Sequence, residues 1–267
     1  MNSPKKARSI FITGASSGIG EALALEFARR GYAVAIAARR LDRLQALETR
    51  LVALGAASVF PVELDVDDLA SIPGVLDRAA QALGRLDVVV ANAGIGPGTP
   101  IGKGRFEEAR RTIATNLLGA MATIDAAVPI LRAQGGGQIV GITSVAGGRG
   151  LAAFGAYSAS KAALHRYLQA LRVEVHHEPI VVTELSPGFI DTDLNRSMPS
   201  RPFVISLEKG GAIMARMIER QVGFRFVPVF PWVFVVPLVK LLPTAWLAAK
   251  PRRDRTEALA VRRPGNE

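Results

Sequence analysis

Residues 9–40 read SIFITGASSGIGEALALEFARRGYAVAIAARR and contain two apolar, strand-like segments, 9–13 and 33–38, joined by a segment with helical spacing. Further apolar segments rich in Val and Ile recur at 58–64, 86–92, 138–143 and 180–186, with helix-like stretches between them, among them 67–84 and 106–132. Near-continuous apolar strands that alternate with helices indicate a parallel sheet buried on both faces. Because crossovers between parallel strands are right-handed, this alternation predicts a doubly wound α/β fold.

Composition limits the kinds of site that the chain can hold. Cysteine is absent, so disulfides and thiolate metal ligands are excluded. The three histidines, His165, His176 and His177, have no partner at metal-ligand spacing, and we expect no metal centre. The length of 267 residues and a hydrophobic content of 49% favour one large domain, which we expect to span residues 1–255, followed by a disordered tail at 256–267.

The net charge of +10 could indicate a nucleic-acid partner, but the basic residues are scattered over the predicted helices and gather only near the end of the chain. There, KPRRDR (250–255) and RR (262–263) flank apolar sequence, which fits an anionic membrane surface better than a nucleic-acid groove. Solubility alone is the simpler explanation. The basic N-terminus is not followed by an apolar segment with a cleavage site. We therefore expect a cytoplasmic protein without a nucleic-acid partner.

The glycine-rich turn TGASSGIG (13–20) follows the first predicted strand and opens the first helix. Gly14, Gly18 and Gly20 allow a tight turn and let backbone N–H groups approach a pyrophosphate at a helix N-terminus. Glycines also serve plain strand–helix turns, so it is the position within a βαβ unit that favours dinucleotide binding. No Lys-Ser/Thr pair follows, which argues against a Walker-type phosphate loop.

The end of the second predicted strand indicates which dinucleotide is bound. An acid at this point commonly binds the adenosine ribose hydroxyls, whereas this sequence has Arg39 and Arg40. The planar fork of Arg39 can hold a 2′-phosphate that an acid would repel, so we expect NADP(H) rather than NAD(H). The hydroxyls of Ser16 and Ser17 can assist. The alternative is a pair of solvated arginines at a helix start, and of the two Arg40 better fits a solvated or secondary role.

The stretch AYSASKAALHRY (156–167) places Tyr157 and Lys161 four residues apart, on one face of a helix. Taken alone, the two could form an ordinary surface pair. Reducing a ketone, however, requires an acid for the forming alkoxide, and a free tyrosine pKa of about 10 is too high for efficient exchange near neutrality. A cation about 5 Å away contributes roughly 3 kcal/mol, or about two pKa units, at an effective dielectric constant of about 20. Lys161 can therefore tune Tyr157 as an acid/base.

Five motifs occur in the order found in the short-chain dehydrogenase/reductase family, which the chain resembles over residues 8–192. They are TGASSGIG, NAG (92–94), Ser144 within ITSVAG, YSASK (157–161) and PGFIDT (187–192). The resemblance implies a single Rossmann-type domain with a doubly wound parallel sheet, NAD(P) as cofactor, and hydride transfer to or from a carbonyl–alcohol pair. It places the catalytic residues at Asn116, Ser144, Tyr157 and Lys161.

The resemblance also implies a set of cofactor contacts. They are Gly14, Ser16, Ser17, Gly18, Ile19, Gly20, Arg39, Asp65, Val66, Asn92, Ala93, Gly94, Tyr157, Lys161, Pro187, Gly188, Ile190 and Thr192. Asn116 is implied to distort its helix and hold a water that passes protons to Lys161, and Ser144 to bind the substrate oxygen. Taken alone, Ser144 could be a turn serine, Asn116 a neutral helix residue and Asp65 a helix N-cap. Members of the family commonly assemble through the helices that hold Asn116 and Tyr157, so we expect a homodimer or homotetramer.

Residues 193–222 occupy the position of the family's substrate lid, and residues 224–255 form an apolar C-terminal extension. The segment RFVPVF, near the start of the extension, predicts the last strand of the sheet. The extension is long enough for a membrane span, but Lys240 and repeated prolines interrupt it. Two alternatives remain open: a lid, pocket or oligomer contact, and an interfacial membrane anchor in which Trp232 and Trp246 lie beside a basic flank.

These observations predict an NADP(H)-dependent oxidoreductase that acts on a carbonyl or alcohol group of an apolar small molecule. The competing hypotheses are a non-catalytic dinucleotide sensor and a membrane-surface scaffold. The complete Asn–Ser–Tyr–Lys set favours the enzyme, because a sensor needs no tuned phenol.

Overall fold

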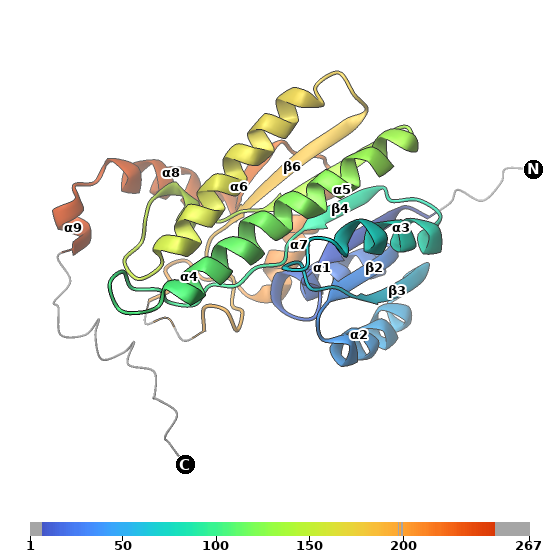
Figure 1. Ribbon diagram of the computed structural model, residues 1–267, viewed down its shortest axis with the longest axis horizontal. Helices are drawn as coiled ribbons and strands as arrows, with labels where there is room; N and C mark the ends of the chain where they lie inside the picture. Colours follow the sequence, from blue (N-terminus) through green and yellow to red (C-terminus); the bar gives the residue numbers. More distant parts are fainter. Residues whose placement is uncertain (1–6, 197, 199, 249–267) are drawn as a thin grey trace, which may run out of the picture.

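The computed structural model describes residues 7–196, 198 and 200–248 of the chain. At its centre is a seven-stranded sheet in the order β3-β2-β1-β4-β5-β6-β7, in which neighbouring strands are parallel (Figure 1). The strands are β1 (Ser9–Thr13), β2 (Ala33–Ala38), β3 (Ser58–Glu63), β4 (Val88–Ala91), β5 (Gly137–Ile142), β6 (Ile180–Pro187) and β7 (Phe224–Val227). The predicted strands are confirmed, with small differences at their ends.

Helices connect the strands and cover both faces of the sheet (Figure 1). They are α1 (Gly18–Arg29), α2 (Leu41–Ala53), α3 (Ile72–Leu83), α4 (Phe106–Ile113), α5 (Gly119–Ala133), α6 (Gly155–Glu174), α7 (Leu207–Glu219), α8 (Val229–Leu241) and α9 (Thr244–Ala248), with a π-helical turn η1 (Ala114–Leu118) and a 3₁₀ turn η2 (Val145–Gly148). The alternation confirms the doubly wound α/β fold. α3 begins later than the predicted residue 67, because the preceding residues form turns and Pro73 lies in its first turn.

Alternate side chains of β1 enter two separate hydrophobic cores. Phe11 is buried on the face covered by α3, α5 and α6, whereas Ile10 and Ile12 are buried on the face covered by α1, α2 and α7. Because both faces of the sheet are buried in apolar cores, the sequence of β1 is mainly apolar without alternation, which is typical of a parallel sheet.

The chain runs outward from β1 to β3 and then returns to place β4 on the other side of β1. In a doubly wound sheet, ligands bind outside the carboxyl ends of the strands at such a switch point. The loops that follow β1 and β4 carry the glycine-rich turn and the NAG motif, so the topology brings these two predicted cofactor segments to the same place.

Residues 106–133 form one helical stretch from α4 through η1 to α5, close to the predicted 106–132. Among the described residues, this is the one helix that by length and composition could cross a membrane. Its residues Ile124, Ala127 and Leu131 are fully buried against the sheet. In this structure it is therefore packed as a core helix of the fold.

The predicted lid and C-terminal extension have regular structure where the chain is described. α7 lies inside the predicted lid but packs against one face of the sheet, because Met214 and Ile218 are fully buried there. The lid prediction therefore remains only for the loop between β6 and α7. β7 begins the extension as predicted, and α8 follows it. The basic cluster at 250–255 and the predicted tail at 256–267 lie outside the described residues.

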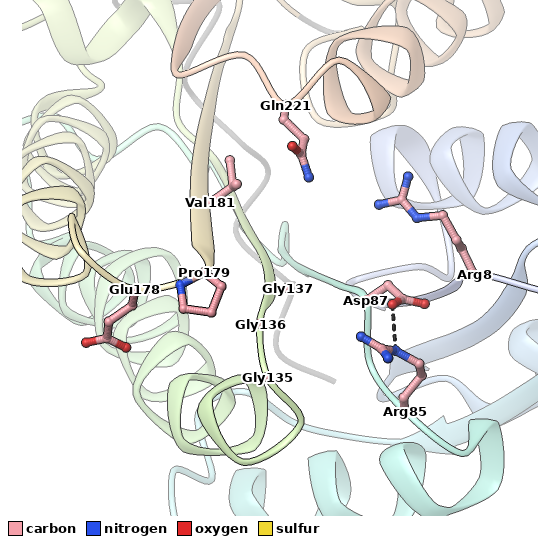
Figure 2. Close-up of a pocket in the computed structure, with 10 residues that line it drawn as sticks. All are labelled: Arg8, Arg85, Asp87, Gly135, Gly136, Gly137, Glu178, Pro179, Val181 and Gln221. Carbon is pink, nitrogen blue, oxygen red and sulfur yellow. Dashed lines mark ion pairs between the residues drawn. The ribbon is translucent and has the colours of Figure 1, made fainter.

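A cavity of about 390 Å³ lies at the opposite edge of the sheet, where the strands begin (Figure 2). Within it, Arg85 Nε lies 2.6 Å from Asp87 Oδ1. Asp87 Oδ2 accepts hydrogen bonds from the backbone N and the hydroxyl of Ser9, at 2.7 and 3.3 Å. None of the predicted site residues lines this cavity, so the candidate site is at the carboxyl edge.

Candidate active site

The glycine-rich turn after β1 has a backbone that favours glycine. Gly14 and Gly18 have φ values of +68° and +58°, in the left-handed region. A Cβ on Gly20 would lie 2.6 Å from Asn92 Nδ2, so any side chain here would displace the residues after β4. The turn leads directly into α1, and a helix N-terminus of this kind favours phosphate binding.

Thr13 and Asn92 tie β1 to β4 at the switch point. Asn92 Nδ2 donates to the carbonyl O of Thr13 at 2.8 Å. Thr13 Oγ1 accepts from the backbone N of Asn92 and of Ala93, at 3.0 and 3.1 Å. Asn92 therefore holds the ends of the two central strands together. Thr13 is an additional positioning residue, and its only signal in the sequence is its place immediately before the first glycine.

Arg40, rather than Arg39, contacts the glycine-rich turn. Arg40 Nη2 donates to Ser16 Oγ at 2.9 Å and to Ser17 Oγ at 3.0 Å. Arg39 is half exposed, and its Nη1 lies 3.8 Å from Asp65 Oδ2, beyond the end of β3. Arg40 is thus exposed, as a solvated residue is, and also hydrogen-bonded to the turn. Sequence alone could not separate the two, because neighbouring residues at a helix start point in different directions.

Asp65 and Val66 follow β3 at the same edge of the sheet. Asp65 Oδ1 accepts a hydrogen bond from the backbone N of Asp67 at 3.1 Å, and α3 begins only at Ile72, so Asp65 closes a turn and does not cap the helix. Val66 is buried against Gly119, where a Cβ would lie 2.9 Å from Val66 Cβ. These contacts fix the loop in which the family resemblance implies two cofactor contacts, Asp65 and Val66.

Asn116 lies in the π-helical turn η1, which interrupts the long helix as the resemblance implied. Its Oδ1 accepts from the backbone N of Ile95 at 2.7 Å, and its Nδ2 donates to Ile95 O at 2.8 Å and to Ser160 Oγ at 3.2 Å. The side chain is fully buried with its polar atoms paired. It is therefore a positioning residue for the loop after β4, and the interpretation as a neutral helix residue is wrong.

Tyr157, Ser144 and Lys161 meet beyond the carboxyl end of β5. Ser144 Oγ accepts from the backbone N of Ala146 at 3.1 Å, as a turn serine does, and the Ser144 hydroxyl lies beside the phenol of Tyr157. Lys161 Nζ donates to the carbonyl O of Ile142 at 2.8 Å and lies 6.0 Å from the centre of the Tyr157 ring. The one-face spacing of Tyr157 and Lys161 thus brings both side chains to the same site.

Gly94 connects this group with Asn116. A Cβ on Gly94 would lie 3.2 Å from Asn116 Oδ1 and 3.6 Å from Lys161 Nζ. The structure therefore brings Asn116 and Lys161 together at one backbone position after β4, and Tyr157 lies beside Gly96, two residues further on.

Burial shifts the two titratable groups of the site toward their neutral forms. It raises the pKa of the Tyr157 phenol, and the hydrogen bond with Ser144 opposes this rise only in part. It also lowers the pKa of Lys161 to about 8. The prediction that the charge of Lys161 lowers the pKa of Tyr157 is wrong here, because desolvation is the largest effect on both groups and the neighbour that lowers the phenol pKa is Ser144.

The PGFIDT segment crosses the same edge of the sheet after β6. Pro187 is the last residue of β6, and Ile190 pairs with Ile205 in an isolated parallel bridge. Thr192 is buried beside the glycine-rich turn, since its Cγ2 lies 3.5 Å from the position of a Cβ on Gly18. This segment therefore joins the phosphate end of the candidate site to its reactive end.

Trp232 of α8 lies against the PGFIDT segment. The sequence predicted for it only a membrane anchor or a lid, pocket or oligomer contact. A Cβ on Gly188 would lie 2.6 Å from Trp232 Cζ2, so the indole occupies the space that any side chain at Gly188 would need. The Nε1 atom of Trp232 is buried without a hydrogen-bond partner. The ring centres of Phe189 and Phe203 lie 6.1 and 5.8 Å from that of Trp232. No sequence spacing links these positions, because only the fold brings α8 to the PGFIDT segment.

The comparisons agree with this geometry. The sequence profile of the short chain dehydrogenases matches residues 8–202. The chain belongs to the short-chain dehydrogenase family. It is 42% identical over 253 residues to an uncharacterized oxidoreductase of Myxococcus xanthus, an alignment that covers 93% of this chain and 98% of the relative. It is 35% identical over 190 residues to the NADP-dependent 3-hydroxy acid dehydrogenase of Schizosaccharomyces pombe, covering 70% of this chain and 73% of that one.

A solved structure shares the fold of this short-chain dehydrogenase. The alcohol dehydrogenase of the archaeon Thermococcus sibiricus, complexed with 5-hydroxy-NADP, superposes with a TM-score of 0.74 at 31% identity, covering 82% of this chain and 95% of that chain. The predicted family, fold and oxidoreductase class are therefore confirmed.

Proposed function

We propose that this short-chain dehydrogenase uses NADP(H) and transfers a hydride between nicotinamide and a carbonyl or alcohol group of an apolar small molecule. The observation that carries the proposal is the position of the half-buried Tyr157 phenol, beside Ser144 and a lysine whose pKa is lowered to about 8. Such a group can give a proton to an oxygen atom and recover it within one catalytic cycle.

The residues at the carboxyl edge fit a dinucleotide that carries a 2′-phosphate. The glycine-rich turn is a cradle that a Cβ at Gly20 would fill. β2 ends in Ala38 without an acid, and the guanidinium of Arg40 lies beside two serine hydroxyls at the start of α1. A cation with hydroxyl partners favours a phosphate over ribose hydroxyls. Arg39, half exposed at the same edge, can supply a second cation.

When bound, NADPH supplies the hydride that reduces the carbonyl carbon. Ser144 holds the substrate oxygen through its hydroxyl, and Tyr157 donates its phenolic proton to that oxygen as negative charge develops on it. The Ser144 hydroxyl, which opposes the rise of the phenol pKa, also stabilises the phenolate that remains on Tyr157, and the protonated Lys161 would hold the cofactor beside it. Asn116 holds the backbone of Ile95, which fixes the loop beside Lys161. In the reverse direction Tyr157 accepts the proton of the alcohol.

An apolar substrate is supported by the side chains around Tyr157. Leu194 Cδ2 and Tyr157 Cδ2 lie 3.2 and 3.3 Å from the position of a Cβ on Gly96, so leucine and phenol border the same space. Trp232 and Phe203 extend this apolar wall past Gly188. The polar groups of Ser144, Tyr157 and Lys161 would thus act on the reacting oxygen, and the apolar side chains around them favour burial of the apolar part of a substrate.

The test is NADPH oxidation with a series of aldehydes and ketones of increasing apolar length. We expect turnover with kcat/KM rising along the series, and Tyr157→Phe should bind NADPH but reduce none of the compounds. A dinucleotide sensor would bind NADPH and give no turnover even as the wild type. Wild-type turnover in Tyr157→Phe would contradict the role assigned to the phenol.

We also propose a homodimer or homotetramer formed through α4, η1 and α6. A mainly apolar groove of about 410 Å³ lies there, lined among others by Phe106, Ile113 and Ala156. Leu118, also at the groove, is 43% exposed, the same fraction as Leu69 elsewhere on the surface. In analytical ultracentrifugation Leu118→Glu should give smaller particles, whereas Leu69→Glu should sediment as the wild type. An unchanged assembly in Leu118→Glu would contradict this interface.

A further inference from the structure

Helix α8 has apolar side chains on two faces, and only one of them is packed against the described part of the chain. Trp232 and Val236 are buried against the body of the protein. Phe230, Phe234, Leu238 and Leu241 are between 60% and 82% exposed. Residues 234, 238 and 241 follow at helical spacing and share one outer face. Phe230 has non-helical φ/ψ angles at a kink near the start of α8, and its ring lies 6.4 Å from that of Phe234, at the end of this face. A helix that is apolar all round is normally covered by a partner.

Close contacts of α8 with the rest of the protein fix the orientation of its outer face. Arg149 Nη1 donates to the carbonyl O of Val239 at 2.7 Å and to that of Leu242 at 2.6 Å, which caps the end of α8. A Cβ on Gly148 would lie 2.7 Å from Val236 Cγ1, so the inner face of α8 contacts η2 closely. Figure 1 shows α8 and α9 at one end of the molecule, away from α2 and β3. α8 therefore cannot turn its outer face inward without losing these contacts.

The charged residues near this face indicate which kind of partner it fits. In the described residues 220–248, Arg220, Arg225 and Lys240 are basic and none is acidic, and Lys240 is exposed on α8 itself. The mostly basic stretch KPRRDR (250–255) follows α9 in the sequence, outside the described residues. In the loop before α7, the nearby acids are paired, Asp193 with Arg196 at 2.7 Å and Asp191 with Arg201 at 2.5 Å. Two copies of this face would bring like charges together, whereas an anionic bilayer offers apolar tails and negative headgroups at once.

We propose that the outer face of α8 (Phe230, Phe234, Leu238 and Leu241) is a docking surface for an anionic phospholipid bilayer. The helix has 13 residues, too few to cross the hydrocarbon layer, so it lies in the plane of the interface with Lys240 at the headgroups. Phe203, which contacts Trp232, is itself more than half exposed and extends the surface toward the candidate active site.

The experiment is co-sedimentation of the full-length protein with vesicles of phosphatidylcholine alone or mixed with phosphatidylglycerol. The wild type should sediment with the mixed vesicles and much less with the neutral ones, and high salt should weaken binding. Phe234→Ser/Leu238→Ser should lower the partition coefficient at least about tenfold. Lys240→Glu should lower it by about fivefold or more. The control Val52→Ser/Val173→Ser, which changes two exposed valines on α2 and α6, should bind as the wild type.

Thermal unfolding and NADPH binding of each variant separate a folding defect from a loss of docking. Both should match the wild type in the α8 variants, so this test does not depend on the proposed catalytic activity. Failure of the wild type to bind mixed vesicles, or equal binding by Phe234→Ser/Leu238→Ser, would overturn the proposal. So would a change from dimer to monomer in that variant without any vesicle binding, because a second copy would then cover the face.

Discussion

The two edges of the same parallel sheet hold their ionisable groups in opposite ways. At the amino edge, Arg85 and Asp87 form an ion pair, and Asp87 accepts further hydrogen bonds from Ser9 (Figure 2). At the carboxyl edge, the hydrogen-bond partners of Tyr157 and Lys161 are neutral, and burial shifts the pKa values of both. A desolvated group with neutral partners is shifted toward its neutral form and can exchange its proton. The two edges therefore differ in the surroundings that they give to ionisable side chains.

Tyr157→Phe is the change expected to have the largest effect. It removes the proton donor but leaves the ring, so kcat should fall by about a thousandfold while the Kd of NADPH stays the same. Asp87→Asn, at the other edge, should lower the midpoint of thermal unfolding and leave kcat unchanged. Steady-state rates with the best carbonyl substrate, fluorescence titration and calorimetry measure these quantities. If Asp87→Asn reduced kcat as strongly as Tyr157→Phe, the contrast between the edges would fail.

The pH dependence should reveal the lowered pKa of Lys161. The side chain is protonated below about pH 8 and loses its charge as the pH rises through that value. The kcat/KM for NADPH should therefore fall by about tenfold per pH unit above it. Arginine remains charged in this pH range. The residual kcat/KM of Lys161→Arg should therefore not fall as the pH rises above about 8. The same decline in that variant would assign it to another group.

Glycine substitutions should distinguish the edges by stability. Gly20→Ala places a methyl group against Asn92 and should lower the free energy of unfolding by about 2–3 kcal/mol, while also weakening NADPH binding. Gly135 lies beside the amino-edge cavity with φ +83° and open space around it. Gly135→Ala should therefore lower the free energy of unfolding only by the strain of alanine in the left-handed backbone conformation, about 1 kcal/mol. Chemical denaturation measures both, and equal losses would contradict the close packing inferred at Gly20.

Trp232→Phe should have the smallest effect. It removes an indole that fills the space beside Gly188, together with an N–H group that has no hydrogen-bond partner among the described residues. We expect KM for long apolar carbonyls to change by roughly threefold to tenfold, with kcat and the Kd of NADPH unchanged. Short carbonyls, which do not reach α8, serve as the control series. An equal change for short and long compounds would place Trp232 away from the substrate.

The fold could be predicted because each strand is buried on both faces and each crossover contains a helix. The reactive pair was visible as a four-residue spacing between Tyr157 and Lys161, but Ser144 and Asn116 acquired roles only through the family motifs. The protonation of the pair was not predictable, because desolvation depends on packing that no spacing reports. The contact of Arg40 with Ser16 and the position of Trp232 depend in the same way on tertiary structure. The cytoplasmic location stays a prediction.

The central claim, an NADP(H) site at the carboxyl edge, is tested most directly by fluorescence titration with NADPH and NADH. The variants are Arg40→Ala, Arg39→Ala and, as a control, Arg43→Ala, which removes an exposed arginine of α2. We predict that the wild type prefers NADPH and that Arg40→Ala raises the Kd of NADPH by about tenfold or more, with the Kd of NADH and the Arg43→Ala variant unchanged. Equal affinity of the wild type for both cofactors, or equal weakening of both by Arg40→Ala, would contradict the account.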